Sequence, residues 1–170
     1  MTAYRNRDTS RWRNRLMTGA CAIGLALALS GNAAPDGFGA QVRSHDESEA
    51  LIFERQQTMS QLSKDAELLG QIVAGIAPPE KLAETTAAIA AGARESAAQF
   101  SNRIPGGHTR AEAWTNNADF QQRMAAFARN ADAMAKAGKT GDVSAVTGLM
   151  IEGLPCKQCH DMYRERKPGV

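Results

Sequence analysis

The residues best suited to chemistry lie near the end of the chain, at Cys156-Lys157-Gln158-Cys159-His160. This C-x-x-C-H spacing is the attachment signature of c-type haem. On a helix, residues three apart share one face, so both thiols can bond to the two vinyl groups of one porphyrin. The imidazole of the next residue can then meet the iron from that side. The motif predicts one covalently bound haem c, with Cys156 and Cys159 as attachment residues and His160 as proximal iron ligand.

Three other uses of this motif remain open. A structural disulfide is possible in an oxidising compartment, although a bridge closing so short a loop would restrain little chain. The protein would then be a haem-free helical interaction protein of the cell envelope. A thioredoxin-like dithiol would need a β-α-β setting that this sequence lacks. A structural zinc would need a fourth ligand and comfortable geometry around two cysteines and an adjacent histidine.

The N-terminus has the pattern of an export signal. Five arginines between Arg5 and Arg15 precede an apolar run over residues 16–29, and small residues suited to cleavage follow. This pattern predicts a secretory signal peptide over residues 1–34. The run of about 14 apolar residues is shorter than the roughly 20 that a membrane anchor needs. We therefore expect a periplasmic protein whose mature chain has no stable membrane insertion.

Composition and charge exclude several classes of protein. Hydrophobic residues make up 43% of the 170 residues but aromatic residues only 5%, which favours packed helices over a β-sandwich or barrel. Residues 1–34 hold five arginines and one aspartate, so they carry +4 and the remaining chain carries −2. A slightly acidic body without clustered cations is a poor partner for nucleic acid. Since paired carboxylates, a nucleophile motif and a phosphate loop are missing too, no enzyme activity is predicted.

Apolar periodicity predicts an all-α fold, an antiparallel four-helix bundle over residues 47–170 that follows a flexible leader over residues 35–46. Capping residues and helix breakers set the expected boundaries. The four helices are predicted to start after Ser44, at Pro79, after Asn117 and after Asp142, and the first three to end near Gly75, before Pro105 and at Gly138.

The first predicted helix contains a charged residue on its apolar side. Met59 belongs to one apolar row, and Arg55 interrupts a second row that continues through Leu62, Leu69 and Ile76. A cation that faces the core needs an anion or an exit to water.

The fourth predicted helix contains Pro155, directly before the first attachment cysteine. Proline removes a helix hydrogen bond and disfavours helical geometry at the preceding Leu154. We therefore predict a bend, or a restarted helix with Pro155 in its first turn.

The chain resembles the class II c-type cytochromes, the cytochrome c′ family, over its predicted mature length. Members of that family carry C-x-x-C-H near the C-terminus of a four-helix bundle. Residues 55–59 are similar to the family's first-helix segment facing the haem, residues 110–114 to the approach to its third helix, and residues 161–164 to its ending. The resemblance implies that Arg55 lies beside the haem propionates and Met59 over the distal face of the iron.

The role of Met59 separates two functions that the resemblance implies. In low-spin members of the family a methionine there is the sixth iron ligand, and we expect the same here: a monohaem electron carrier with His160 and Met59 on the iron. Its partners would be other redox proteins. In the alternative, Met59 only packs, the iron is five-coordinate, and the open face binds nitric oxide or carbon monoxide. A homodimer is plausible in either case.

A further expectation concerns Trp114, which should contact either the bundle or the edge of the haem.

Overall fold

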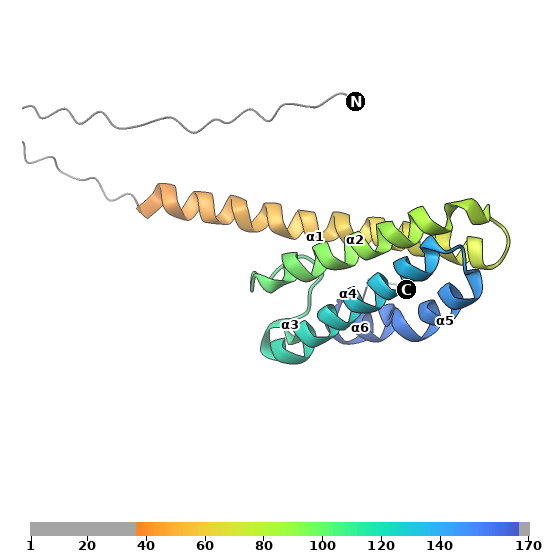
Figure 1. Cartoon of the computed structure of the whole chain (residues 1–170). Helices are drawn as coiled ribbons and strands as arrows, with labels where there is room; N and C mark the ends of the chain where they lie inside the picture. The colour runs from red at the N-terminus through yellow and green to blue at the C-terminus, as the bar shows by residue number, and fades with distance from the viewer. Residues whose placement is uncertain (1–36, 167–170) are drawn as a thin grey trace, which may run out of the picture. The chain divides into compact units, whose positions relative to one another are not determined.

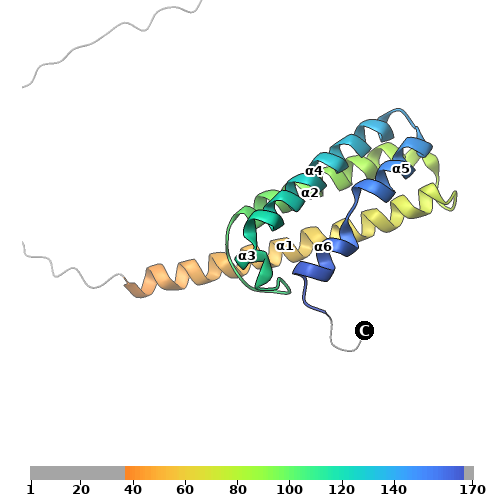
Figure 2. The same cartoon turned by 90° about the horizontal axis from the view of Figure 1, so that it is seen from below.

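The computed structural model describes residues 37–166, with side chains from residue 44 onward. Figures 1 and 2 show the arrangement of its helices. The elements are α1 (Gly37–Val73), the 3₁₀ turn η1 (Pro79–Lys81), α2 (Leu82–Ser101), α3 (Glu112–Thr115), α4 (Asn117–Lys139), α5 (Val143–Gly153) and α6 (Cys156–Tyr163). Within these residues there is no β-strand, only one isolated antiparallel bridge between Thr109 and Arg164.

Four helical segments make up the bundle: α1, α2, α4, and α5 with α6. The first helix packs on α2, α2 packs on α4, and α4 packs on α5, while α6 continues from α5 and packs on α3. Because short turns join α1 to α2 and α4 to α5, each of these pairs is antiparallel. The predicted antiparallel four-helix bundle is therefore confirmed. No helix in the described part of the chain is long and apolar enough to cross a bilayer.

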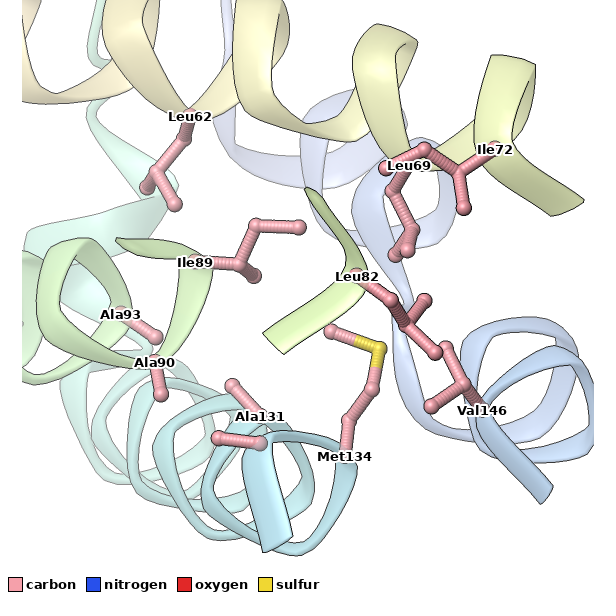
Figure 3. Close-up of a cluster of buried hydrophobic side chains, with 11 residues drawn as sticks. Leu62, Leu69, Ile72, Leu82, Ile89, Ala90, Ala93, Ala131, Met134 and Val146 are labelled. Carbon is pink, nitrogen blue, oxygen red and sulfur yellow. The ribbon is translucent and has the colours of Figure 1, made fainter. Parts of the chain in front are cut away.

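The core lies where these helices face one another (Figure 3). Leu69 comes from α1, Leu82 and Ile89 from α2, Met134 from α4 and Val146 from α5, and all five are fully buried. Burying a side chain of this size contributes roughly 1.5–3 kcal/mol. This cluster holds the end of the bundle that lies away from the α3 segment.

Glycines allow two close approaches within the bundle. A Cβ on Gly138 of α4 would collide with the Thr86 hydroxyl of α2, so the two helices are closer there than any side chain would permit. Gly106 and Gly107, with φ of 139° and 61°, bring the α2–α3 loop against α1. A Cβ on Gly106 would lie 2.5 Å from the Ile52 side chain.

The first helix differs from its prediction at both ends. It begins at Gly37, earlier than the predicted start after Ser44 and within the segment for which the sequence predicts a flexible leader. The Ser44 carbonyl accepts a 2.7 Å hydrogen bond from the Ser48 hydroxyl within the continuing helix, so this serine does not start it. Because α1 ends at Val73, Ile76 lies beyond the helix and is 78% exposed, so its predicted place in the seam is wrong.

Of the later boundaries, the one at Asp142 is confirmed and those at Asn117 and Gly138 differ from the prediction. The Asp142 carboxylate accepts a 2.9 Å hydrogen bond from the Ala145 amide and caps α5 as predicted. Asn117, in contrast, is the first residue of α4, and its side chain donates to the Ala113 carbonyl. Gly138 does not end α4, which runs to Lys139; Gly141, at φ 73°, makes the turn instead.

The predicted interruption at Pro155 is confirmed. The fifth helix ends at Gly153 and the sixth begins at Cys156, with Pro155 at the N-cap position between them. The Pro155 carbonyl accepts the first hydrogen bond of the new helix, from the Cys159 amide at 3.0 Å. The C-x-x-C-H motif is therefore carried by a short helix of its own.

Candidate haem site

The short helix α6 is anchored at its C-terminal end by the loop that precedes α3. The Arg110 amide donates to the Tyr163 carbonyl and the Glu165 amide to the His108 carbonyl, each at 2.9 Å. At its other end, the Asn130 side chain of α4 donates a 3.0 Å hydrogen bond to the Gly153 carbonyl. Contacts at both ends therefore fix the position of the motif relative to the bundle.

Tyr163 gives α6 a third attachment. Its ring is buried and packs against Phe120 of α4, with 4.9 Å between ring centroids. Its hydroxyl donates a hydrogen bond to the Asp119 carboxylate, which also accepts one from the Arg123 side chain at 2.6 Å. Burial, followed by the hydrogen bond to Asp119, raises the pKa of Tyr163, so its hydroxyl stays protonated and keeps donating.

Of the three motif side chains, those of Cys156 and His160 are exposed and that of Cys159 is half-buried. Cys156 and Cys159 are free thiols, exposed and half-buried respectively, so no disulfide joins them. Desolvation raises the pKa of both thiols and keeps them protonated at neutral pH. Partial burial and then the positive charge of Arg164 lower the pKa of the exposed His160. Its imidazole is therefore neutral at pH 7, the form that binds a metal.

A group of buried side chains, here called the aromatic cluster, lies behind the motif. Its members are Phe100, Ala113, Trp114, Phe120, Met124 and Tyr163. Met59 of α1 and Cys159 of α6 both pack against it, although α1 and α6 are not themselves among the closely packed helix pairs. The cluster thus brings the predicted distal residue and a predicted attachment residue to one apolar wall.

Met59 also packs against the main core of the bundle. Its half-buried side chain contacts the cluster that contains Leu62 and Leu69 as well as the aromatic cluster. Both environments are apolar. Met59 therefore has the surroundings of a packing residue, and one of the two clusters that it contacts is also contacted by Cys159.

Arg55 is buried, with 3% of its surface exposed, and its guanidinium points at the end of α2. It donates to the carbonyls of Gln99 (3.0 and 3.2 Å), Asn102 (2.6 Å) and Ile104 (2.7 Å). The C-terminus of a helix carries partial negative charge, so a cation is stabilised there. The predicted need of this cation for a counter-charge is thus met in part by carbonyl dipoles.

Sequence reasoning missed this carbonyl contact, and it left Trp114 without a specific role. The Arg55 guanidinium carbon lies 4.7 Å from the centroid of the Phe100 ring and 5.3 Å from that of Trp114. Trp114 itself is 8% exposed, and its Nε1 is buried with no hydrogen-bond partner among the described residues. The sequence shows that Trp114 is the one tryptophan outside the predicted signal peptide, but not that its N–H is buried without a partner.

The residues present fit a haem c. Two free thiols three residues apart on one helix and a neutral imidazole are the donor set for covalent attachment and proximal ligation. The aromatic cluster supplies an apolar wall, and Trp114 Nε1 is a buried donor that lacks an acceptor. In the described part of the chain no group of three or more His, Cys, Asp or Glu side chains is arranged to hold a metal ion, so the zinc alternative finds no ligand set there.

A family model, a curated relative and solved structures that match this chain all point to the same family. The family model described as Cytochrome C′ matches residues 50–164. The cytochrome c′ of Alcaligenes xylosoxydans xylosoxydans is 35% identical over 71 residues, which are 41% of this chain and 56% of that protein. The aligned stretch therefore covers little more than half of the length of this curated relative.

Solved structures of cytochrome c prime from Alcaligenes xylosoxidans have the same fold. A ferrous variant with bound NO is 25% identical, with a TM-score of 0.64, and the match covers 71% of this chain and 97% of that one. A nitric oxide complex of another mutant is 26% identical, with a TM-score of 0.65 and the same coverage. The ferric protein is also similar, with 26% identity and a TM-score of 0.64, again over 71% of this chain and 97% of that one.

Proposed function

Because the chain belongs to the cytochrome c′ family, we propose that it is a periplasmic monohaem protein that binds a diatomic gas, nitric oxide or carbon monoxide. Membership in the family implies a covalently bound haem c with its iron. When bound, that group would supply an iron centre with one coordination position open to a small ligand. Two of the similar solved structures are nitric oxide complexes, which favours gas binding over electron transfer.

The observation that carries the proposal is the packing of Met59 against both hydrophobic clusters of the bundle, the surroundings of a side chain that fills space. Cys156 and Cys159 would hold the haem by two thioether bonds, and the neutral His160 would bind the iron from the α6 side. Met59 would cover the opposite face. Since its side chain packs against apolar residues on both sides, it excludes water from that face without needing to bind the iron.

Electron transfer with Met59 as the sixth ligand is the second candidate. Met59 packs against the same cluster as Cys159, so a possible sulfur ligand lies near the attachment residue, which favours this candidate. A His and Met pair raises the reduction potential of a haem and saturates the iron, which suits a carrier that exchanges electrons with redox partner proteins. The two candidates differ in one bond, so one measurement separates them.

The test is the optical spectrum of the haem-loaded protein, oxidised and reduced, with and without nitric oxide. For the wild type we expect a five-coordinate, high-spin spectrum that changes when gas is added to the reduced protein. Met59→Leu conserves side-chain volume and should leave the coordination state unchanged. The matched control is Met124→Leu, because Met124 is buried in the same aromatic cluster.

A six-coordinate, low-spin spectrum with a methionine-sulfur charge-transfer band would contradict the gas-binding proposal. Met59→Leu should then convert the haem to the five-coordinate form while Met124→Leu does not, and electron transfer would be the function. His160→Ala tests the proximal assignment in both cases, since it should abolish the native axial spectrum.

A further inference from the structure

Trp114 has an unmet hydrogen-bond donor inside the haem site. Its side chain is buried against Phe100 and Phe120, and no described residue accepts a hydrogen bond from its Nε1. The indole N–H can only donate, so no rotation turns it into an acceptor. A buried donor without a partner bears the full cost of its desolvation, and such groups in folded proteins call for an explanation.

Beside that donor, Arg55 carries a buried positive charge that no anion in the described part of the chain neutralises. Its guanidinium carbon is 5.3 Å from the centroid of the Trp114 ring. Four hydrogen bonds to carbonyl oxygens use four of its five N–H groups, which leaves one on Nη1. None of the ion pairs in the described part of the chain includes it. Buried charges in proteins are normally paired with an opposite charge.

A carboxylate would satisfy both the unpaired N–H of Trp114 and the unpaired charge of Arg55. A carboxylate can accept a hydrogen bond at each of its two oxygens, from donors on two different residues, and it neutralises the cation. A water molecule could accept from the indole but would leave the charge of Arg55 without an anion. The two donors adjoin the aromatic cluster against which Cys159 packs, so the carboxylate has to be one that reaches this wall.

The family resemblance already implies that Arg55 lies beside a haem propionate; we propose that Trp114 Nε1 donates a hydrogen bond to the same carboxylate. The inference rests on the proposed function, since it requires a haem attached at Cys156 and Cys159. It assigns Trp114 a specific role: the indole positions the haem by a hydrogen bond, and its ring also shields the guanidinium from water.

The test compares two variants of the haem-loaded protein. Trp114→Phe removes the N–H and keeps an aromatic ring. Phe120→Leu is the matched control, because it alters packing in the same aromatic cluster and removes no hydrogen-bond donor. The readout is the propionate-bending band in the resonance Raman spectrum, whose frequency falls when the carboxylate loses a hydrogen bond. We expect this band to shift to lower frequency in Trp114→Phe and to keep its wild-type position in Phe120→Leu.

Each other outcome overturns the inference in an identifiable way. An unshifted band in Trp114→Phe, with haem attached, contradicts the role of Trp114 and leaves the proposed function intact. Equal shifts in both variants mean that packing, not a hydrogen bond, controls the band. A wild-type protein without covalent haem refutes the proposed function first, and this inference with it.

A measurement on the wild type covers the case in which Trp114→Phe does not mature. The sequence has two tryptophans, and Trp12 lies in the predicted signal peptide. The ultraviolet resonance Raman bands of the indole in the exported holoprotein therefore report on Trp114 alone. Bands of a hydrogen-bonded indole N–H support the inference, and bands of a free N–H overturn it.

Discussion

The Asp119 carboxylate of α4 helps to hold in place α6, the helix that carries the C-x-x-C-H motif. It accepts hydrogen bonds from Arg123 and from the Tyr163 hydroxyl of α6. These two bonds, with that of Arg123 first, hold the pKa of Asp119 below its ordinary value. A carboxyl group with a lowered pKa in the folded state stabilises the fold above its unfolded pKa, near 3.9, and this contribution is lost as the pH falls through the folded pKa.

The acid sensitivity of the fold should therefore depend on Asp119. We expect Asp119→Asn to lower the melting temperature at pH 7 and to lose less further stability than the wild type between pH 5 and about pH 3. Thermal unfolding followed by circular dichroism over this range measures both effects. Asp132→Asn is the control, because it removes an exposed ion pair with Arg94 that is worth little. Identical pH profiles for Asp119→Asn and the wild type would contradict the role of Asp119.

Arg55 illustrates what can be predicted at the level of one residue. The apolar row in which it stands is visible in the sequence, and so is the need for a counter-charge. Its carbonyl partners are not, because they lie 44 to 49 residues away and face it only once α2 packs on α1. Chemistry that depends on residue type is therefore predictable here, whereas chemistry that depends on tertiary contact is not.

Among the helices, the packing of α2 on α4 depends on one glycine. Gly138 has no room for a Cβ because of Thr86, whereas a Cβ on Gly148 of α5 would have nothing within 4 Å. Inserting a methyl group into a packed core costs roughly 1–3 kcal/mol. At an open helical position, alanine is instead better than glycine by roughly 0.5–1 kcal/mol.

Two alanine substitutions should therefore have opposite effects. We expect Gly138→Ala to destabilise the fold by about 1–3 kcal/mol and Gly148→Ala to stabilise it by about 0.5–1 kcal/mol. Chemical denaturation of both variants measures the difference in unfolding free energy. If Gly138→Ala is as stable as Gly148→Ala, the close approach of α2 and α4 is wrong.

Helix ends were predictable where a residue dictates backbone geometry. Pro155 interrupts the last helix because its ring fixes the backbone and removes an N–H, and Asp142 caps α5 directly after the turn at Gly141. The helix start predicted after Ser44 is wrong, since a serine that can cap a helix is also tolerated inside one. Gly138 was interpreted as a helix stop, but its small size is used for packing, and this use is visible only when α2 is in place.

For the whole molecule, the predicted all-α bundle is confirmed, and so is the resemblance to the cytochrome c′ family. The fold was predictable because composition, periodicity and the C-x-x-C-H motif all indicate the same architecture. The predicted signal peptide over residues 1–34 lies outside the described residues, as does the start of the 35–46 segment. The predicted homodimer and redox partners also stay predictions.

The export prediction can be tested on the full chain. In a bacterial host that attaches haem in the periplasm, we expect the chain to give a haem-stained periplasmic band. A chain that starts at residue 35 should stay in the cytoplasm without covalent haem. Cys156→Ser/Cys159→Ser in the full chain is the control, because it should be exported and remain unstained. Periplasmic, haem-stained protein from the shortened chain would contradict the signal-peptide assignment.

The two residues proposed for the faces of the haem site come from the first and the last helix of the bundle, Met59 from α1 and His160 from α6. In a chain that is exported with its N-terminus first, α1 with Met59 would cross the membrane first and α6 with the two cysteines last. The break at Pro155 leaves that last helix as a separate short unit whose Cys156 is exposed and whose Cys159 is half-buried. If the chain is exported in this way, we expect haem attachment at α6 to follow the passage of all the other helices of the bundle.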